Sequence, residues 1–286
     1  MLVIVAALGA AAAWGISAAC DNRSTRLIGT LQALAWVQII GFVLVLPMAI
    51  WEGAPSHPSA RSLAWIAVGG VGVSVGLTFS YAAIARGAVS VVASVTAVDG
   101  ALAALASVAL GEHIAIATAA GLAIVVAGML VILHATAAQE RAGVSGHSLA
   151  AVLLAGGAAC GFGIFLLAAI RAGEAFGDGQ LQLIYRVLPF AAVGLPLLVR
   201  GRLGWPGRRG WPWVTGAAAL QTAGFVLYRL AGRSGDVAIP SVLSSQFAVF
   251  AIVAGVLVLG ERLSHRQIGG LAGLLVGVAV IAGTQS

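Results

Sequence analysis

Long apolar runs alternate with short polar segments along the whole chain. A helix needs about 20 mostly apolar residues to cross a bilayer core of roughly 30 Å, and ten runs of suitable length are bounded by charges, glycine or proline. The predicted transmembrane helices lie near residues 2–20, 31–51, 62–85, 88–110, 114–135, 147–171, 180–199, 211–232, 236–260 and 266–283. The segments between them are too short to fold as a soluble domain. The pattern therefore predicts an all-α, polytopic membrane protein with ten transmembrane helices.

The composition excludes several other classes of protein. Of the 286 residues, 60% are hydrophobic and 8% are charged, whereas a soluble domain is about 45–50% apolar and about 25% charged. The net charge is +6, but all 15 cations are arginines scattered singly or in pairs, so no basic stripe for nucleic acid is present. Cys20 and Cys160 lie far apart in apolar runs, which indicates neither a disulfide scaffold nor a metal site.

Several landmarks recur about 148 residues apart. The matching pairs are Leu110–Gly111–Glu112 with Leu259–Gly260–Glu261, Trp14–Gly15 with Phe162–Gly163, and Tyr81 with Tyr228. We therefore expect two five-helix repeats, 1–140 and 141–286. An odd number of helices per repeat gives the two copies opposite orientations, which is the inverted-repeat plan of secondary transporters, with a central cavity between the halves.

Asp99 is the only acid that falls inside a predicted span; the other acids lie at span ends or in loops. A carboxylate near the bilayer centre costs about 2.5–3.5 kcal/mol on insertion scales, so it should face a cavity, find a partner or be protonated. It would carry a coupling proton or bind a substrate ammonium; alternatively, it pins neighbouring helices. Arg186 and Arg229 are the two cations inside spans, and each could reach water along its stem or pair with Asp99.

Polar and aromatic side chains form stripes at helical spacing in both halves. Ser74, Thr78 and Tyr81 share one helix face, and Gln221 and Tyr228 follow the same spacing in the second half. The expected substrate-binding residues are Trp14, Ser74, Thr78, Tyr81, Asp99, Phe162, Gln221, Tyr228, Ser244, Ser245 and Gln246. Such a lining suits a small amphipathic solute. The alternative for any single residue is a hydrogen bond between helices.

The sequence gives no support to catalysis or metal binding. Gly72–Gly76 matches the GxSxG nucleophile pattern, but it lies inside a predicted helix rather than at a strand-to-helix turn. The five histidines fall in loops or at span ends, and no HExxH or phosphate-binding loop is present. We expect a protein that is not an enzyme and that uses no cofactor or metal.

These landmarks together resemble the drug/metabolite transporter superfamily, specifically its EamA-like ten-helix branch. The residues that carry the resemblance are Trp14–Gly15, Leu110–Gly111–Glu112, Leu259–Gly260–Glu261 and the glycines at 121, 128, 270 and 277. Within that branch the chain is most similar to the YddG-type exporters of aromatic and other amino acids. The resemblance implies a cavity formed by spans 1, 3, 4, 6, 8 and 9, and export by alternating access without ATP.

We therefore expect a multi-pass carrier of the inner membrane that exports small amphipathic metabolites, with aromatic and other neutral amino acids as the first candidates. Its partners would be the small-molecule substrate and the lipid bilayer, without nucleic acid, and a monomer is compatible with the sequence. Two alternatives remain open. One is export of drugs or other metabolites through the same fold, and the other is a passive facilitator or channel.

Two indications of membrane orientation disagree. Ten arginines lie in loops after odd-numbered spans and three in loops after even-numbered spans. Because cytoplasmic loops carry the excess of positive charge, this count places both chain ends outside the cytoplasm. The family resemblance implies both ends inside. Both orientations are kept as alternatives.

Overall fold

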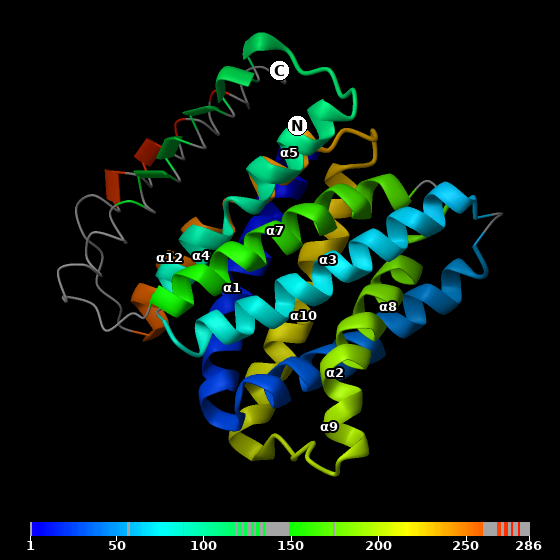
Figure 1. The fold of residues 1–286 in the computed structure, drawn as a ribbon, viewed down its shortest axis with the longest axis vertical. Coiled ribbons are helices and arrows are strands. Elements are labelled where there is room, and N and C mark those ends of the chain that lie inside the picture. The colour runs from blue at the N-terminus through cyan, green and yellow to red at the C-terminus, as the bar shows by residue number, and fades with distance from the viewer. Residues whose placement is uncertain are drawn as a thin grey trace.

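The computed structural model is a bundle of helices that lie side by side (Figure 1). It describes residues 2–55, 58–87, 89–117, 149–173 and 175–259, with scattered positions between 119 and 134 and between 268 and 280. The elements are α1 (Leu2–Ile28), α2 (Thr30–Glu52), α3 (Ala60–Ile84), α4 (Val89–Thr96), α5 (Asp99–Ala109), α7 (Leu149–Ala172), α8 (Asp178–Pro189), the π-helical turn η1 (Phe190–Gly194), α9 (Leu195–Val199), α10 (Gly207–Ala231), α11 (Ala238–Ser244) and α12 (Phe247–Leu259). Within this described part no strand occurs, which confirms the all-α prediction.

Eight of the ten predicted spans correspond to helices or pairs of helices in the described residues. Of the other two, 114–135 is described in part, and its described positions from residue 116 on are helical, whereas 266–283 lies mostly outside the described residues. Among the described residues, six helical stretches can cross a membrane by length and composition: Leu2–Ile28, Thr30–Glu52, Ala60–Ile84, Val92–Ala109, Ala150–Ala172 and Asp178–Val199. The helix α10 is as long as these, but its first two turns carry Gly, Arg and Pro among the tryptophans.

The first helix continues well past the predicted end at residue 20. It runs to Ile28 and includes Asp21, which is buried. The expectation that Asp99 is the only acid within a span is therefore wrong. A search for apolar runs stops at the first charge, whereas this helix continues and the carboxylate of Asp21 finds partners on other helices inside the bundle. Its exposed side in the same stretch carries Arg23 and Arg26.

The repeated aromatic–glycine pairs lie at close approaches between helices from opposite halves of the sequence. A Cβ on Gly15 would lie 2.5 Å from the carbonyl oxygen of Phe247 in α12. A Cβ on Gly163 would lie 3.0 Å from the carbonyl oxygen of Asp99 in α5. The recurrence of these glycines thus reflects two equivalent close contacts, α1 with α12 and α7 with α5, as small residues allow between membrane helices.

Glycines also set the contact between α3 and α7, which lie along each other in the middle of the bundle (Figure 1). A Cβ on Gly161 would lie 2.6 Å from the amide nitrogen of Gly76 and 2.7 Å from the carbonyl oxygen of Gly72. The GxSxG sequence therefore lies within a helix and packs against another helix.

Gly161→Ala is expected to lower stability by about 1–3 kcal/mol, because the two backbones must separate to admit a methyl group. The matched control is Gly156→Ala in the same helix, where a Cβ would meet no atom within 4 Å. Thermal unfolding of the purified protein in detergent measures both variants. Equal melting temperatures for the two would contradict this packing.

Two predicted spans, the fourth and the ninth, are each interrupted by a single turn. In the fourth, α4 ends at Thr96 and α5 begins at Asp99; in the ninth, α11 ends at Ser244 and α12 begins at Phe247. Each break carries a tight hydrogen bond between residues three apart, from Val98 N to Val95 O (3.4 Å) and from Gln246 N to Leu243 O (3.2 Å).

The sequence contains no signal for these two turns. No proline or glycine marks either break in the sequence, and apolar spacing does not register a local change from four-residue to three-residue hydrogen bonding. The two breaks lie at matching positions in the two halves, and α5 packs against α11 while α4 packs against α12.

Candidate functional site

A cavity of about 140 Å³ lies inside the bundle, lined by side chains from α1, α2, α3, α4, α5, α7, α8, α10 and α12. A cavity needs about 10–15 Å³ by the same measure to admit one water, so this cavity is far larger than a single-water site. That space fits a solute of amino-acid size. The resemblance implied walls from spans 1, 3, 4, 6, 8 and 9; the structure adds α2 and α8 to them.

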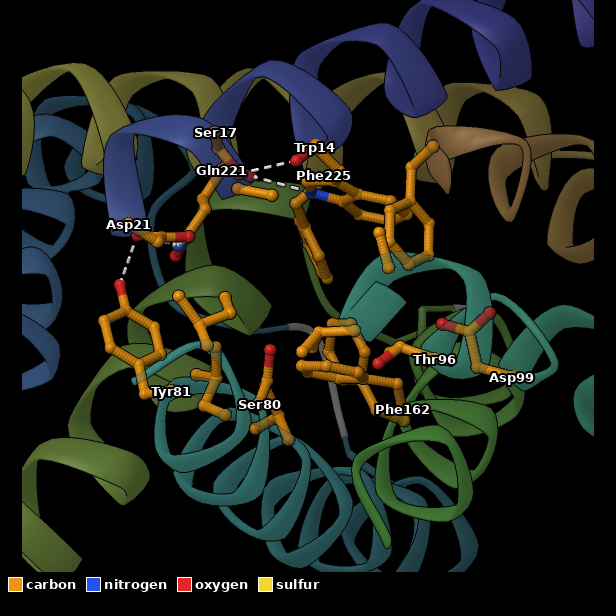
Figure 2. Close-up of a pocket in the computed structure, with 18 of the residues that line it drawn as sticks. Trp14, Ser17, Asp21, Ser80, Tyr81, Thr96, Asp99, Phe162, Gln221 and Phe225 are labelled. Carbon is orange, nitrogen blue, oxygen red and sulfur yellow. Dashed lines mark hydrogen bonds between the residues drawn. The ribbon is translucent and has the colours of Figure 1, made fainter. Parts of the chain in front are cut away.

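Aromatic rings form the middle of the cavity wall. Figure 2 shows Trp14 and Phe225 on one side and Phe162 on the other, between Asp21 at one end and Asp99 at the other. Phe165 stacks on Phe225 with ring centroids 5.8 Å apart. These rings bury a large apolar area with few rotatable bonds, so they form a preformed apolar wall.

At one end of the cavity Asp21 accepts hydrogen bonds from side chains of two other helices. The Tyr81 hydroxyl donates to Oδ1 at 2.5 Å, and Nε2 of Gln221 donates to Oδ2 at 3.1 Å. The bond to Tyr81 is visible in Figure 2. Asp21 thus connects α1 to α3 and α10 and presents a carboxylate to the cavity.

Arg186 from α8 lies on the other side of Gln221. Its Nη1 donates to Oε1 of Gln221 (3.0 Å) and of Gln38 (3.3 Å), and its Nη2 donates to the Thr222 hydroxyl (3.1 Å). Gly41 leaves the space for this side chain, because a Cβ there would lie 2.6 Å from Cζ. All these partners are neutral.

Asp99 lies at the opposite end, on the first turn after the break between α4 and α5. Its Oδ1 accepts hydrogen bonds from the Ser245 hydroxyl and from the amide of Gly100, both at 2.6 Å. Ser245 lies in the matching break between α11 and α12. The carboxylate therefore joins the two interrupted helices at their interruptions.

The buried charges differ in how they are compensated. In the described part of the chain four charged residues are buried: Asp21, Asp99, Arg186 and Arg229. Arg229 pairs with Asp178, with Nε 2.9 Å from Oδ1. The other three form no ion pair within the described residues, and all three line the cavity. Because an unpaired charge is costly in a bilayer and marks a functional site, this cavity is the candidate site.

Comparison with known proteins identifies the family. The model of the EamA-like transporter family matches residues 1–134 and 149–283. The chain belongs to the EamA-like transporter family. This EamA-like transporter is also similar in fold to a solved structure titled "Crystal structure of protein", with 20% identity, a TM-score of 0.73, and coverage of 99% of this chain and 96% of that one. No curated protein matches it. Membership makes the protein a multi-pass membrane transporter of the drug/metabolite type.

Five of the predicted site residues of this EamA-like transporter line the cavity: Trp14, Tyr81, Asp99, Phe162 and Gln221. The other six do not line it. They are Ser74, Thr78, Tyr228, Ser244, Ser245 and Gln246. The hydroxyls of Ser74, Thr78 and Ser244 donate to carbonyls three or four residues earlier in their own helices, a local bond that short hydroxyl side chains favour.

Of the remaining three, Ser245 and Tyr228 contact residues that line the cavity, whereas Gln246 bonds within its own segment. Ser245 donates to Asp99, Gln246 donates to the carbonyl oxygen of Val242, and the Tyr228 hydroxyl donates to the carbonyl oxygen of Leu166. The Tyr228 ring also lies against Trp14, with ring centroids 5.7 Å apart.

Neither arginine pairs with Asp99 in this EamA-like transporter. Arg186 bonds to neutral groups, and Arg229 is buried against Asp178 instead of extending to water. The sequence interpretation missed Asp21 as a site residue, along with the neighbours of Arg186 in α8. One signal was available: Gln182, Tyr185 and Arg186 have the i, i+3, i+4 spacing that places polar groups on one helix face.

Proposed function

We propose that this transporter exports amino acids, aromatic and other neutral ones, across the inner membrane by alternating access and without ATP. The observation that carries the proposal is the cavity itself. It is of amino-acid size, has aromatic walls, and holds charged groups of both signs at its boundary. Rings would hold the apolar side chain, and polar groups would hold the charged ends, as in other ligand sites that are mostly apolar with a few oriented polar groups.

Alternating access would come from rocking of two five-helix repeats, 1–140 and 141–286, around the cavity. The separate family matches over 1–134 and 149–283 support this division. So do the equivalent glycine contacts and the two matching helix breaks. Interrupted helices next to a central site are typical of secondary transporters with inverted repeats.

Asp99 would couple transport to a proton. Its carboxylate is buried at the junction of the two interrupted helices and lacks a cation among the described residues. A group that gains and loses a proton there would change the hydrogen bond to Ser245 and thus the contact between α5 and α11. Trp14, Tyr81, Phe162 and Gln221 would contact the substrate.

Efflux from proteoliposomes tests the proposal. Vesicles are loaded with a labelled mixture of amino acids, and efflux is followed with and without an imposed pH gradient. We expect saturable release of neutral and aromatic amino acids, faster with the gradient. Release of no amino acid above that of protein-free vesicles would refute amino-acid export and would direct the search to drugs and other metabolites.

A further inference from the structure

We propose that Asp21 and Arg186 select zwitterions by binding both charged ends of one substrate molecule, the ammonium at Asp21 and the carboxylate at Arg186. This inference rests on the proposed transport of amino acids and assigns the residues that would distinguish an amino acid from an amine or an acid. It also places substrate recognition at the end of the cavity where Asp21 lies, away from Asp99 at the other end (Figure 2).

The amide of Gln221 lies between the two opposite charges. Its Nε2 donates to Asp21 at 3.1 Å, and its Oε1 accepts from Arg186 at 3.0 Å. The amide thus presents a donor to the carboxylate and an acceptor to the guanidinium, as a substrate's ammonium and carboxylate would. A zwitterion in the cavity replaces contacts in which one partner is charged with contacts in which both partners are charged, as in an ammonium–carboxylate or guanidinium–carboxylate pair.

Unpartnered polar atoms lie in the same cavity wall as Arg186. Nε2 of Gln38, Oε1 of Gln182 and the hydroxyl of Tyr185 are buried without a hydrogen-bond partner in the described residues, and all three side chains line the cavity. Buried polar groups in folded proteins are nearly always satisfied. The Gln38 amide, whose Oε1 accepts from Arg186, can donate through Nε2. It adds a donor beside the guanidinium that suits a carboxylate.

Asp21 retains capacity for an ammonium. A carboxylate has about four acceptor positions, and Asp21 accepts from two side chains, Tyr81 and Gln221. Ser17 lies one turn before it, also lines the cavity, and donates its hydroxyl to the carbonyl oxygen of Trp14. Its oxygen can therefore accept a further bond beside the carboxylate.

A purely structural role explains this arrangement poorly. Asp21 and Arg186 are only 5% and 6% exposed. Two opposite charges buried to this extent would compensate each other best in a direct ion pair, as Arg229 and Asp178 do with Nε 2.9 Å from Oδ1. Here a neutral amide separates them, and both charges remain available from the cavity. The separation is consistent with a site that holds two charges for a ligand that carries both.

Ligand-induced thermal stabilisation of the purified full chain in detergent tests the inference without requiring transport. The probes are L-phenylalanine, phenethylamine, which lacks the carboxylate, and 3-phenylpropionate, which lacks the ammonium. We expect L-phenylalanine to bind at least about tenfold more tightly than either analogue, because each loses one hydrogen bond to a charged group.

Two variants test which charged end of the substrate each residue binds. Asp21→Asn keeps an acceptor for Tyr81, and we expect it to lose the preference for L-phenylalanine over 3-phenylpropionate. Arg186→Gln is expected to lose the preference over phenethylamine. Asp236→Asn and Arg200→Gln, at exposed positions, are the matched controls and should bind like the wild type.

A third variant tests the inference independently, in case the first two do not fold. Gln221→Glu places a carboxylate beside Arg186, where it competes with the carboxylate of a probe. We expect weaker binding of L-phenylalanine and 3-phenylpropionate, with binding of phenethylamine retained.

The inference is overturned if the wild type binds phenethylamine or 3-phenylpropionate as tightly as L-phenylalanine, or if none of the three probes binds. Saturable flux of another solute in proteoliposomes would then leave a transporter without zwitterion selection. If L-phenylalanine binds with the expected preferences but no flux occurs, the binding site stands and export fails.

Discussion

Asp99→Asn is expected to abolish the response of transport to a pH gradient while leaving exchange of substrate across the membrane intact. Asparagine has the same shape and can still accept hydrogen bonds from Ser245 and Gly100, which both lie 2.6 Å from Oδ1, but it cannot ionise. One pH unit corresponds to 1.36 kcal/mol per proton, so coupling to one proton yields up to about tenfold accumulation in the wild type. The variant should show no accumulation.

Proteoliposomes with an imposed gradient of one pH unit measure this effect. Asp236→Asn is the control, because its carboxylate is exposed in a loop and its loss should leave the gradient response unchanged. A gradient response in Asp99→Asn equal to that of the wild type would show that this carboxylate is structural.

Ala93→Phe is expected to stop transport altogether. Ala93 lies on α4, is buried and lines the cavity, and a phenyl ring there would occupy much of a space of about 140 Å³. Where the ring does not fit, overpacking costs about 1–3 kcal/mol. Flux of labelled amino acids should fall to the level of protein-free vesicles.

The matched control is Leu105→Phe on the neighbouring helix α5, where the side chain is 69% exposed on the outer surface of the bundle. It adds a ring in the same region without entering the cavity, and its flux should equal that of the wild type. Thermal unfolding of both variants checks that they are folded. Wild-type flux in folded Ala93→Phe would mean that substrate takes another path.

The positions of the helices could be predicted from the apolar runs, because a helix that crosses the bilayer core needs about 20 mostly apolar residues. Two of the recurring landmarks, Gly15 and Gly163, lie at close helix contacts. Of the residues singled out in the sequence, Trp14, Tyr81 and Gln221 line the cavity.

Helical spacing identifies a face of a helix but not what that face contacts. Ser74 and Thr78 share a face with Tyr81, yet their hydroxyls donate to their own helix. Apolar spacing does not predict the place of Asp21, because a charge usually ends an apolar run, whereas partners on α3 and α10 satisfy this carboxylate inside the bundle. Such partners come from distant parts of the chain, so only the folded structure identifies them.

Counterflow tests the central claim most directly, namely that this protein carries amino acids by alternating access through the cavity. Vesicles loaded with unlabelled L-phenylalanine are diluted into a trace of the labelled compound. A carrier is predicted to accumulate label transiently above its equilibrium level, and Ala93→Phe should not. Label that only equilibrates, at a rate independent of the internal load, would contradict the claim and indicate a passive channel.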